Sequence, residues 1–331
     1  MFRRLLIKAI ASFYLKRPEV AELIEARYQS WGSMFFSGLN LMSFQLRREK
    51  IFRLTSVMLE LTNQCNLKCM MCPVNRSMER ARGFMSFDLF RRIIDDNPGL
   101  EYVLLYNWGE PFLHPDIFKM IEYAADRGIR PNTTSNGTLL TPDMIEKIAA
   151  SRLDRLTISM DGLPESYEKI RGVSYEKVEQ NLTRLIQRRN ETKSNVKIDL
   201  GLSLFEENEQ DVQAFRERWK NRVDRIQIQP RTYMNEGEIP PQARRTRRCD
   251  EIWRGNLVVL WDGTVAPCCV DFEGVLAVGD ANTQRLRDIV NGPEMRRLRR
   301  NLNRGKFVSR CATCVEYSTP IVKPRFDDHS S

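Results

Sequence analysis

The sequence predicts an α/β fold in which six parallel strands alternate with helices and a small cysteine-rich α+β region follows. Between about residues 54 and 230, short apolar runs alternate with longer segments of helical periodicity. Strands separated by helices in this way form a parallel sheet with right-handed crossovers. The length of 331 residues allows one large domain and a smaller one, and five of the eight cysteines lie in the last third of the chain.

We expect three regions: a helical, basic amphipathic extension (1–50), the alternating α/β region (51–230) and the cysteine-rich region (231–331). Helix signals at the ends support the assignment, such as Ser86 and Thr141 as N-caps and Gly128 as a terminator. The expected strands are 56–62, 101–107, 129–137, 153–162, 195–204 and 223–230. The expected helices between and after them are 86–96, 114–128, 141–151, 164–170, 175–190, 209–221 and 295–305.

Three cysteines in the loop after the first strand, Cys65, Cys69 and Cys72, have C-x3-C-x2-C spacing. Three thiolates can hold three irons of a [4Fe–4S] cube and leave the fourth iron open to a small molecule. A zinc site would need four ligands, and neither His114 nor His329 has ligand spacing to the trio. A disulfide does not suit an odd number of cysteines in a chain that has the composition of a cytosolic protein.

This motif resembles the signature of the radical S-adenosylmethionine (SAM) superfamily. The resemblance implies that the open iron chelates SAM, and that reductive cleavage of SAM yields a 5′-deoxyadenosyl radical that abstracts hydrogen from a substrate. It also implies a partial (β/α)6 TIM-like barrel, open on one side, with chemistry at the carboxyl ends of the strands. The sequence departs from the family pattern at Met71, where an aromatic residue is usual; a thioether can also pack over a cluster.

By the same resemblance, polar residues after the next three strands are expected to contact SAM. The segment NWGEP is similar to the Gly-Gly-Glu motif of the family, with Trp108 in place of the first glycine. Glutamate can accept hydrogen bonds from an ammonium group, and glycine allows a close approach of backbone. The expected contacts are Trp108, Gly109, Glu110, Ser135, Asn136, Ser159, Asp161 and, through a carboxylate, Arg171. Turn chemistry is the alternative explanation of these residues.

The second cysteine group resembles twitch domains, which are shortened SPASM domains. A β-hairpin with its turn at Asp262–Gly263 would bring Cys249 and Cys268 together. The resemblance implies one auxiliary [4Fe–4S] cluster with four ligands: Cys249, Cys268, Cys311 and Cys314. Cys269 is left without a ligand role, or it replaces Cys268 as a ligand. The alternative to an auxiliary cluster is a zinc ribbon held by four cysteines.

The resulting hypothesis is a radical SAM oxidoreductase that dehydrogenates a small molecule such as a sugar or cyclitol-like alcohol. The auxiliary cluster would accept the electron left on the substrate radical. One alternative is an epimerase in which the thiol of Cys269 donates a hydrogen atom to the substrate radical. Modification of a peptide or of a lipid-linked substrate, and a non-catalytic zinc protein, are further alternatives.

The formal net charge of +9 favours anionic partners. The basic runs 243–248 and 296–300 lack interleaved aromatic residues, so we read the second run as a solvated helix face and do not expect a nucleic-acid partner. Expected partners are a small-molecule substrate, with anionic and lipid-linked compounds as options, and an external flavodoxin- or ferredoxin-like electron donor. We expect a cytoplasmic protein, with peripheral contact to the inner membrane face through residues 1–17 as an option.

Overall fold

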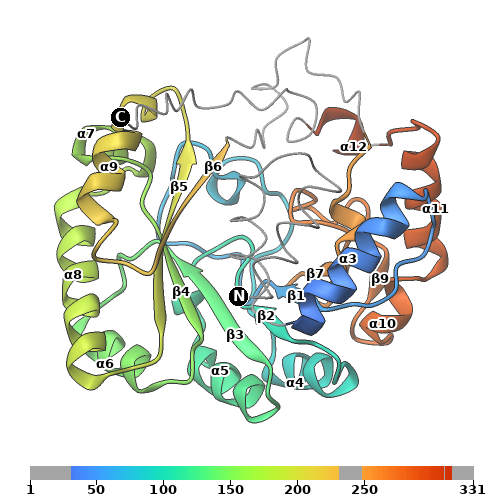
Figure 1. The fold of residues 1–331 in the computed structure, drawn as a ribbon, viewed down its shortest axis with the longest axis horizontal. Helices are drawn as coiled ribbons and strands as arrows, with labels where there is room; N and C mark the ends of the chain where they lie inside the picture. The colour runs from blue at the N-terminus through green and yellow to red at the C-terminus, as the bar shows by residue number, and fades with distance from the viewer. Residues whose placement is uncertain (1–30, 231–247, 309, 315–331) are drawn as a thin grey trace.

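The computed structural model describes residues 31–230, 248–308 and 310–314 (Figure 1). The expected amphipathic segment 1–17 and the basic run 243–247 therefore lie outside the described residues. No helix in the described part of the chain has the length and apolar character needed to traverse a lipid bilayer.

One nine-stranded sheet forms the centre of the fold, with the order β6-β5-β4-β3-β2-β1-β7-β8-β9. Neighbours from β6 to β7 pair in parallel, and β8 and β9 are added antiparallel. The strands are β1 (Ser56–Leu59), β2 (Tyr102–Leu104), β3 (Arg130–Ser135), β4 (Arg155–Ser159), β5 (Lys197–Leu204), β6 (Arg225–Pro230), β7 (Asn256–Val259), β8 (Thr264–Ala266) and β9 (Gly279–Asp280). All six strands predicted for the first region are confirmed, and the sheet is open because β6 and β9 are its edges.

The two regions share this sheet. Residues Ser56 to Leu59 of β1 pair in parallel with Asn256 to Val259 of β7. The predicted hairpin is confirmed: β7 and β8 pair antiparallel, and Gly263 at the turn has a φ of +97°. The cysteine-rich region is thus attached to the large region by backbone hydrogen bonds, which the sequence did not predict.

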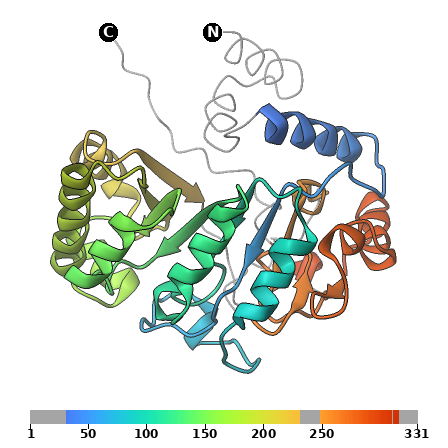
Figure 2. The same cartoon turned by 90° about the horizontal axis from the view of Figure 1, so that it is seen from below.

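Helices cover the outer side of the curved sheet (Figures 1 and 2). Two N-caps are confirmed: Ser86 accepts from the N–H of Leu89 at 3.1 Å, and Thr141 accepts from that of Met144 at 3.2 Å. The helices are α3 (Trp31–Gln45), α4 (Phe87–Asp96), α5 (Ile117–Asp126), α6 (Pro142–Ala150), α7 (Pro164–Arg171), α8 (Tyr175–Thr192), α9 (Val212–Trp219), α10 (Leu286–Ile289), α11 (Pro293–Asn303) and α12 (Arg310–Thr313). One continuous hydrophobic core lies between the sheet and these helices and extends to α10 and α11.

The sequence analysis predicted that the basic run on α11 is a solvated helix face. The structure corrects this prediction, because one of its arginines is buried. Arg299 is fully buried. Its guanidinium donates to the carbonyl oxygens of Ile252, Glu49 and Val290 at 2.7 to 3.0 Å. Burial lowers the pKa of Arg299 to about 9, which reflects the cost of desolvating the cation. This arginine joins α11 to the segment before β7, to the chain that leads into β1 and to the end of α10.

Replacing Arg299 with methionine should destabilise the protein by roughly 2–4 kcal/mol, because the buried carbonyl groups lose their donors. The adjacent Arg300 is a matched control, since it is exposed and, among the described residues, its side chain pairs with Glu49 alone, at 2.7 Å. Arg300→Met should cost less than about 1 kcal/mol. Chemical unfolding of both variants measures the difference, and equal losses would contradict the structural role of Arg299.

Candidate active site at the carboxyl ends of the strands

The first cysteine motif lies on the loop that follows β1. The N–H of Cys72 donates to the carbonyl oxygen of Cys69 at 3.2 Å, which folds the loop back on itself. Cys65 and Cys72 are half-buried, and Cys69 is buried. Together with Trp108, the half-buried pair packs on a small apolar cluster of Val74, Met78 and Phe272. Two of the three thiols thus share an apolar environment, and Cys69 is close enough to Cys72 to affect its pKa.

The electrostatics of this loop disfavour free thiolates. Burial raises the pKa of the Cys72 thiol to about 11, and the nearby thiols of Cys69 and Cys65 contribute in the same direction. Burial also raises the pKa of Cys65, against a hydrogen bond from the N–H of Leu67 at 3.4 Å. Bound metal cations deprotonate coordinating thiols. The loop therefore has the donor chemistry of a metal-cluster site, in which positive metal ions compensate the grouped sulfur charges.

Among the described residues, no three His, Cys, Asp or Glu side chains converge closely enough to share a single metal ion. A [4Fe–4S] cube distributes its ligands over separate irons, so its thiolates need not meet at one point. The donor set of the loop, three cysteine sulfurs, fits such a cluster.

Arg171, at the end of α7, lies beside this loop. Its Nη1 donates to the sulfur of Cys69 at 3.8 Å, and its other nitrogens bind the carboxylate of Asp161 at 2.5 and 2.6 Å. Burial by itself would lower the pKa of Arg171, but Asp161 and then Cys69 raise it above the ordinary value. Asp161 is fully buried and also accepts from the N–H of Ser203 at 2.6 Å. The carboxylate that the sequence analysis sought for Arg171 is thus Asp161, another predicted site residue.

Glu110 organises the turn after β2, and it is almost fully buried, not an exposed acid. One carboxylate oxygen accepts from the hydroxyl of Ser135 at 2.8 Å and from the N–H of Phe112 at 3.2 Å. The other accepts from the N–H of Asn136 at 2.8 Å. These bonds join the turn after β2 to the turn after β3, and so bring together three of the predicted contacts.

Asn136 extends the network to the cysteine loop. Its side-chain amide donates to Asn66 at 2.9 Å and approaches the sulfur of Cys65 at 3.9 Å. Gly109 has a φ of +97°, and a Cβ there would lie 2.3 Å from the carbonyl oxygen of Thr62. Any other residue at this position would displace the backbone beside the cysteine loop.

The titration of Glu110 should affect the stability of the apoprotein. Burial raises its pKa to about 7, against the hydrogen bonds of Asn136 and Ser135. A folded-state pKa above the ordinary value means that the stabilising contribution is complete below about pH 4.5 and is lost as the pH rises to about 7.

The stability difference between the wild type and Glu110→Gln should therefore shift against the wild type by roughly 3 kcal/mol between pH 4.5 and pH 7, because the variant cannot titrate at this position. Thermal unfolding at several pH values measures the difference. The exposed Glu165 on α7 provides the control variant, Glu165→Gln. A difference that stays constant with pH would contradict a raised pKa for Glu110.

Trp108 connects the two cysteine groups. Its indole N–H donates to the carbonyl oxygen of Cys269 at 2.9 Å, and its ring meets Phe272 edge-on with centroids 5.8 Å apart. The same ring contacts the apolar cluster that holds Cys65 and Cys72. The residue that departs from the family motif is therefore a bridge between the loop after β1 and the loop after β8.

The second cysteine group is also brought together. Burial raises the pKa of Cys268 well above its ordinary value, and the charges of four other thiols raise this pKa further. These four are Cys269, Cys249, Cys311 and Cys314. Cys268 is half-buried, and Cys249 is buried beside the main core. All eight cysteines lie in the described part of the chain, and none forms a disulfide.

Cys269 differs from its neighbour in its surroundings. It is half-buried and, like Met58 of β1, packs against the cluster of Val258, Leu260 and Ala266. The pKa of Cys268 is influenced by every other thiol of the second group, whereas the backbone carbonyl of Cys269 accepts a hydrogen bond from Trp108 of the large region. The structure thus distinguishes two adjacent cysteines that the sequence could not rank.

A buried ion pair at the end of β1 was missed by the sequence analysis. Arg80 binds the fully buried Glu60 at 2.5 Å and donates to the carbonyl oxygen of Phe272. Glu273 in turn accepts from the N–H groups of Glu79 and Arg80 at 2.9 and 3.1 Å. Nη1 of Arg80 is buried and has no hydrogen-bond partner among the described residues. The glutamate within the apolar run of the first strand was the signal that could have indicated this pair.

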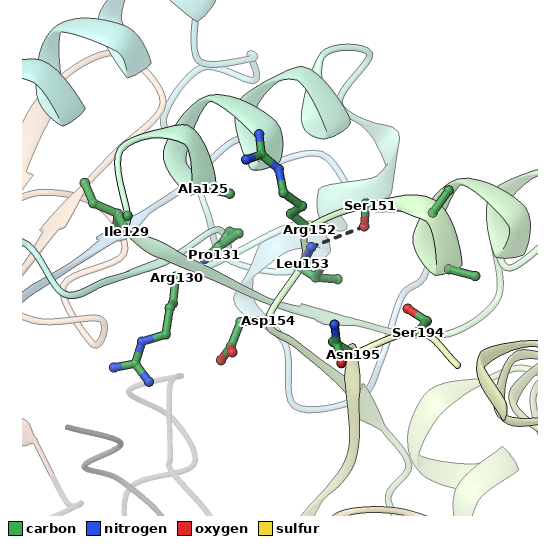
Figure 3. Close-up of a pocket in the computed structure, with 13 residues that line it drawn as sticks. Ala125, Ile129, Arg130, Pro131, Ser151, Arg152, Leu153, Asp154, Ser194 and Asn195 are labelled. Atoms are coloured by element: carbon green, nitrogen blue, oxygen red, sulfur yellow. Dashed lines mark hydrogen bonds between the residues drawn. The ribbon is translucent and has the colours of Figure 1, made fainter. Parts of the chain in front are cut away.

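Ser159 is half-buried at the end of β4, next to the Asp161 turn. The predicted site residues lie at the carboxyl ends of the strands. A cavity of about 460 Å³ lies at the opposite, amino-terminal ends (Figure 3). That cavity is lined by the turns that precede β3, β4 and β5, including Arg130, Asp154 and Asn195. In parallel α/β barrels the chemistry belongs to the carboxyl ends of the strands, so the cavity is not the candidate site.

Both cysteine-bearing regions of the chain match models of known protein families. Residues 59–218 match the model of the radical SAM superfamily, and residues 249–315 match the SPASM model, an iron–sulfur cluster-binding domain. The fold is similar to the crystal structure of BtrN in complex with AdoMet and 2-DOIA, with a TM-score of 0.54 and 17% identity over 80% of this chain and 93% of that chain. The predicted partial barrel with a C-terminal cluster domain is confirmed.

Curated relatives match part of the chain, and two of them serve as examples. AdoMet-dependent heme synthase of Methanosarcina barkeri is 35% identical over 116 residues, which are 34% of this chain and 33% of that protein. The tungsten-containing aldehyde ferredoxin oxidoreductase cofactor-modifying protein of Pyrococcus furiosus is 36% identical over 129 residues, which are 36% of each chain. The chain spans about a third of the length of the curated relatives it matches.

Proposed function

Because the chain belongs to the radical SAM superfamily and carries an iron–sulfur cluster-binding SPASM domain, we propose that it is an oxidoreductase that dehydrogenates a small molecule. The single observation that carries this proposal is the juxtaposition of two cysteine groups, joined through Trp108 and the Cys269 carbonyl. One group suits radical generation, and the other suits removal of an electron.

Cys65, Cys69 and Cys72 would hold the first [4Fe–4S] cluster. With SAM bound, this cluster supplies a 5′-deoxyadenosyl radical that removes a hydrogen atom from an unactivated carbon. The protein's own contribution is to orient and to shield. The loop buries Cys69 and partly shields Cys65 and Cys72 from water, and Arg171 places a positive charge next to Cys69.

The residues proposed to position SAM form two groups. Trp108, Gly109 and Glu110 shape the turn after β2, and Ser135 and Asn136 shape the turn after β3. Ser159, Asp161 and Arg171 lie after β4 and on α7. The hydrogen bonds of Glu110 fix the distance between the turns, which supports a role in presenting backbone and amide groups to a cofactor. The buried Nη1 of Arg80, which has no hydrogen-bond partner in the part of the chain that the structure describes, is proposed to contact a hydroxyl or anionic group of the substrate.

Cys249, Cys268, Cys311 and Cys314 would hold the auxiliary cluster with all four irons ligated, so that it has no open iron for substrate. Dehydrogenation of an alcohol requires the loss of one hydrogen atom from carbon, one proton from oxygen and one further electron. SAM bound at the first site would supply the acceptor of the hydrogen atom, water would take the proton, and a cluster held by these four cysteines would supply the acceptor of the electron. An external flavodoxin- or ferredoxin-like donor is proposed to supply the first electron, in the cytoplasm.

A specific observation favours epimerisation as a second candidate. The carbonyl oxygen of Cys269 accepts from the indole N–H of Trp108, whose ring contacts the apolar cluster beside Cys65 and Cys72, so Cys269 connects the second cysteine group to the first. Its S–H bond could give a hydrogen atom to the substrate radical. The hydrogen atom removed from carbon would then be replaced by one from sulfur, and reduction of the thiyl radical by one electron and one proton from the external donor would restore the thiol.

Anaerobic turnover in deuterium oxide with a panel of sugar and aminocyclitol alcohols distinguishes the candidates. Dehydrogenation should give a carbonyl product with Cys269→Ala nearly as active as the wild type. Epimerisation should give solvent deuterium at the reacting carbon and should be lost in Cys269→Ala. If 5′-deoxyadenosine forms with none of these substrates beyond the uncoupled background, the proposed substrate class is wrong.

A further inference from the structure

Helix α3 is oriented with its polar side chains toward the protein. Ser37, Asn40 and Ser43 are exposed by only 7%, 0% and 1%. Asn40 explains this orientation, because its amide donates to the carbonyl oxygen of Arg53 at 2.8 Å and accepts from the N–H of Phe52 at 2.9 Å. The buried face of α3 is therefore held by hydrogen bonds to the chain that enters β1.

The opposite face of α3 exposes large apolar side chains. Phe35 is 62% exposed, Met42 is 38% exposed, and Leu46, directly after the helix, is 61% exposed. Their spacing places them on one side of the helix, with the half-buried Leu39 between them. Phe52, at 51% exposure, follows in the same connection to β1. Figure 2 shows α3 at the outer margin of the fold, away from the sheet. Apolar surface of this kind marks a site of contact with a membrane or another molecule.

The charges around this apolar face are basic. Residues 31–48 contain no Asp or Glu, and Arg47, Arg48 and Lys50 are exposed. The end of α11 lies alongside, because Nη1 of Arg47 donates to the carbonyl oxygen of Asn303, and the amide of Asn303 donates to that of Arg47. Two more exposed basic residues, Arg304 and Lys306, follow there. The neighbouring acid Glu49 is neutralised by Arg300 at 2.7 Å.

We propose that the exposed face of α3 docks on an anionic lipid bilayer. Apolar side chains on one side of a helix insert at the boundary of headgroups and acyl chains, and adjacent arginines and lysines bind the anionic headgroups. A second copy of the chain is a poorer occupant, because it would bring two basic rims together. The docking would hold the barrel at the membrane surface without a spanning segment.

Flotation of the full-length holoprotein with vesicles tests this proposal. The vesicles contain phosphatidylcholine alone or equal parts of phosphatidylcholine and phosphatidylglycerol. Binding should be stronger to the anionic vesicles and should weaken as salt is added. The triple variant Phe35→Gln, Met42→Gln and Leu46→Gln should lower the partition coefficient about tenfold or more, since it removes the inserted apolar surface.

Two controls separate docking from general surface effects. Val275→Gln changes a side chain of 61% exposure at a different place and should leave partition unchanged. Arg48→Gln with Lys50→Gln should weaken binding to anionic vesicles, whereas Lys177→Gln with Lys197→Gln, which changes exposed lysines on α8 and β5, should not. Circular dichroism checks that each variant is folded.

The proposal is overturned by three results. The first is a wild type that does not float with anionic vesicles. The second is a triple variant that floats as well as the wild type, because binding would then belong to another part of the chain. The third is a wild-type dimer in light scattering that the triple variant converts to a monomer, which would assign the face to a second copy.

Discussion

Replacing Cys69 with alanine should remove the iron held by the loop after β1, so that the reconstituted protein retains about four of about eight irons. Cys69 is the buried member of the trio, and it is the sulfur that Arg171 approaches. A cluster that has lost one of only three ligands cannot be held at this site. Iron and sulfide analysis and the electron paramagnetic resonance spectrum of the reduced protein measure the loss.

Cys269→Ala is the matched control for iron content, because the same residue type is removed from the other loop without removing a proposed ligand. It should retain about eight irons. A Cys69→Ala protein with full iron content and an unchanged spectrum would show that the trio does not hold a cluster.

Replacing Cys268 with alanine should separate radical formation from product formation. The first cluster remains, so SAM should still be cleaved, whereas the carbonyl product should fall to background because the electron on the substrate radical has no acceptor. The reason is that Cys268 is a proposed ligand of the auxiliary cluster, and the thiols of Cys269, Cys249, Cys311 and Cys314 lie near enough to influence its pKa. The ratio of 5′-deoxyadenosine to oxidised product, measured anaerobically, reports the effect.

The neighbouring variant, Cys269→Ala, again serves for comparison. If Cys268→Ala left the ratio of 5′-deoxyadenosine to oxidised product unchanged, the proposed electron-transfer role of the second cysteine group would be wrong. If the two variants exchanged behaviour, Cys269 would be the ligand and Cys268 the remaining thiol.

The repeating part of the fold could be predicted from sequence because its causes are local. Apolar runs such as 195–204 and caps such as Ser86 act through neighbours in the chain. The turns that end β2 and β3 were found for the same reason, since each follows a strand directly. The spacing of Cys65, Cys69 and Cys72 is likewise a local signal, and its resemblance to a family pattern was confirmed.

Contacts between distant segments could not be predicted in this way. The pairing of β1 with β7 joins residues about 200 positions apart, and the bond from Trp108 to the Cys269 carbonyl spans 161 positions. The burial of Arg299 was missed because a basic run reads as a solvated surface unless the carbonyl groups that surround it are known. The inverted orientation of α3 depends on the hydrogen bonds of Asn40, and these form only after the chain has returned toward β1.

Cleavage of SAM by the anaerobically reconstituted, dithionite-reduced protein tests the central claim most directly. The account predicts 5′-deoxyadenosine and methionine in equal amounts, with both absent when Cys65, Cys69 or Cys72 is replaced. A fully iron-loaded and reduced protein that leaves SAM intact would contradict it.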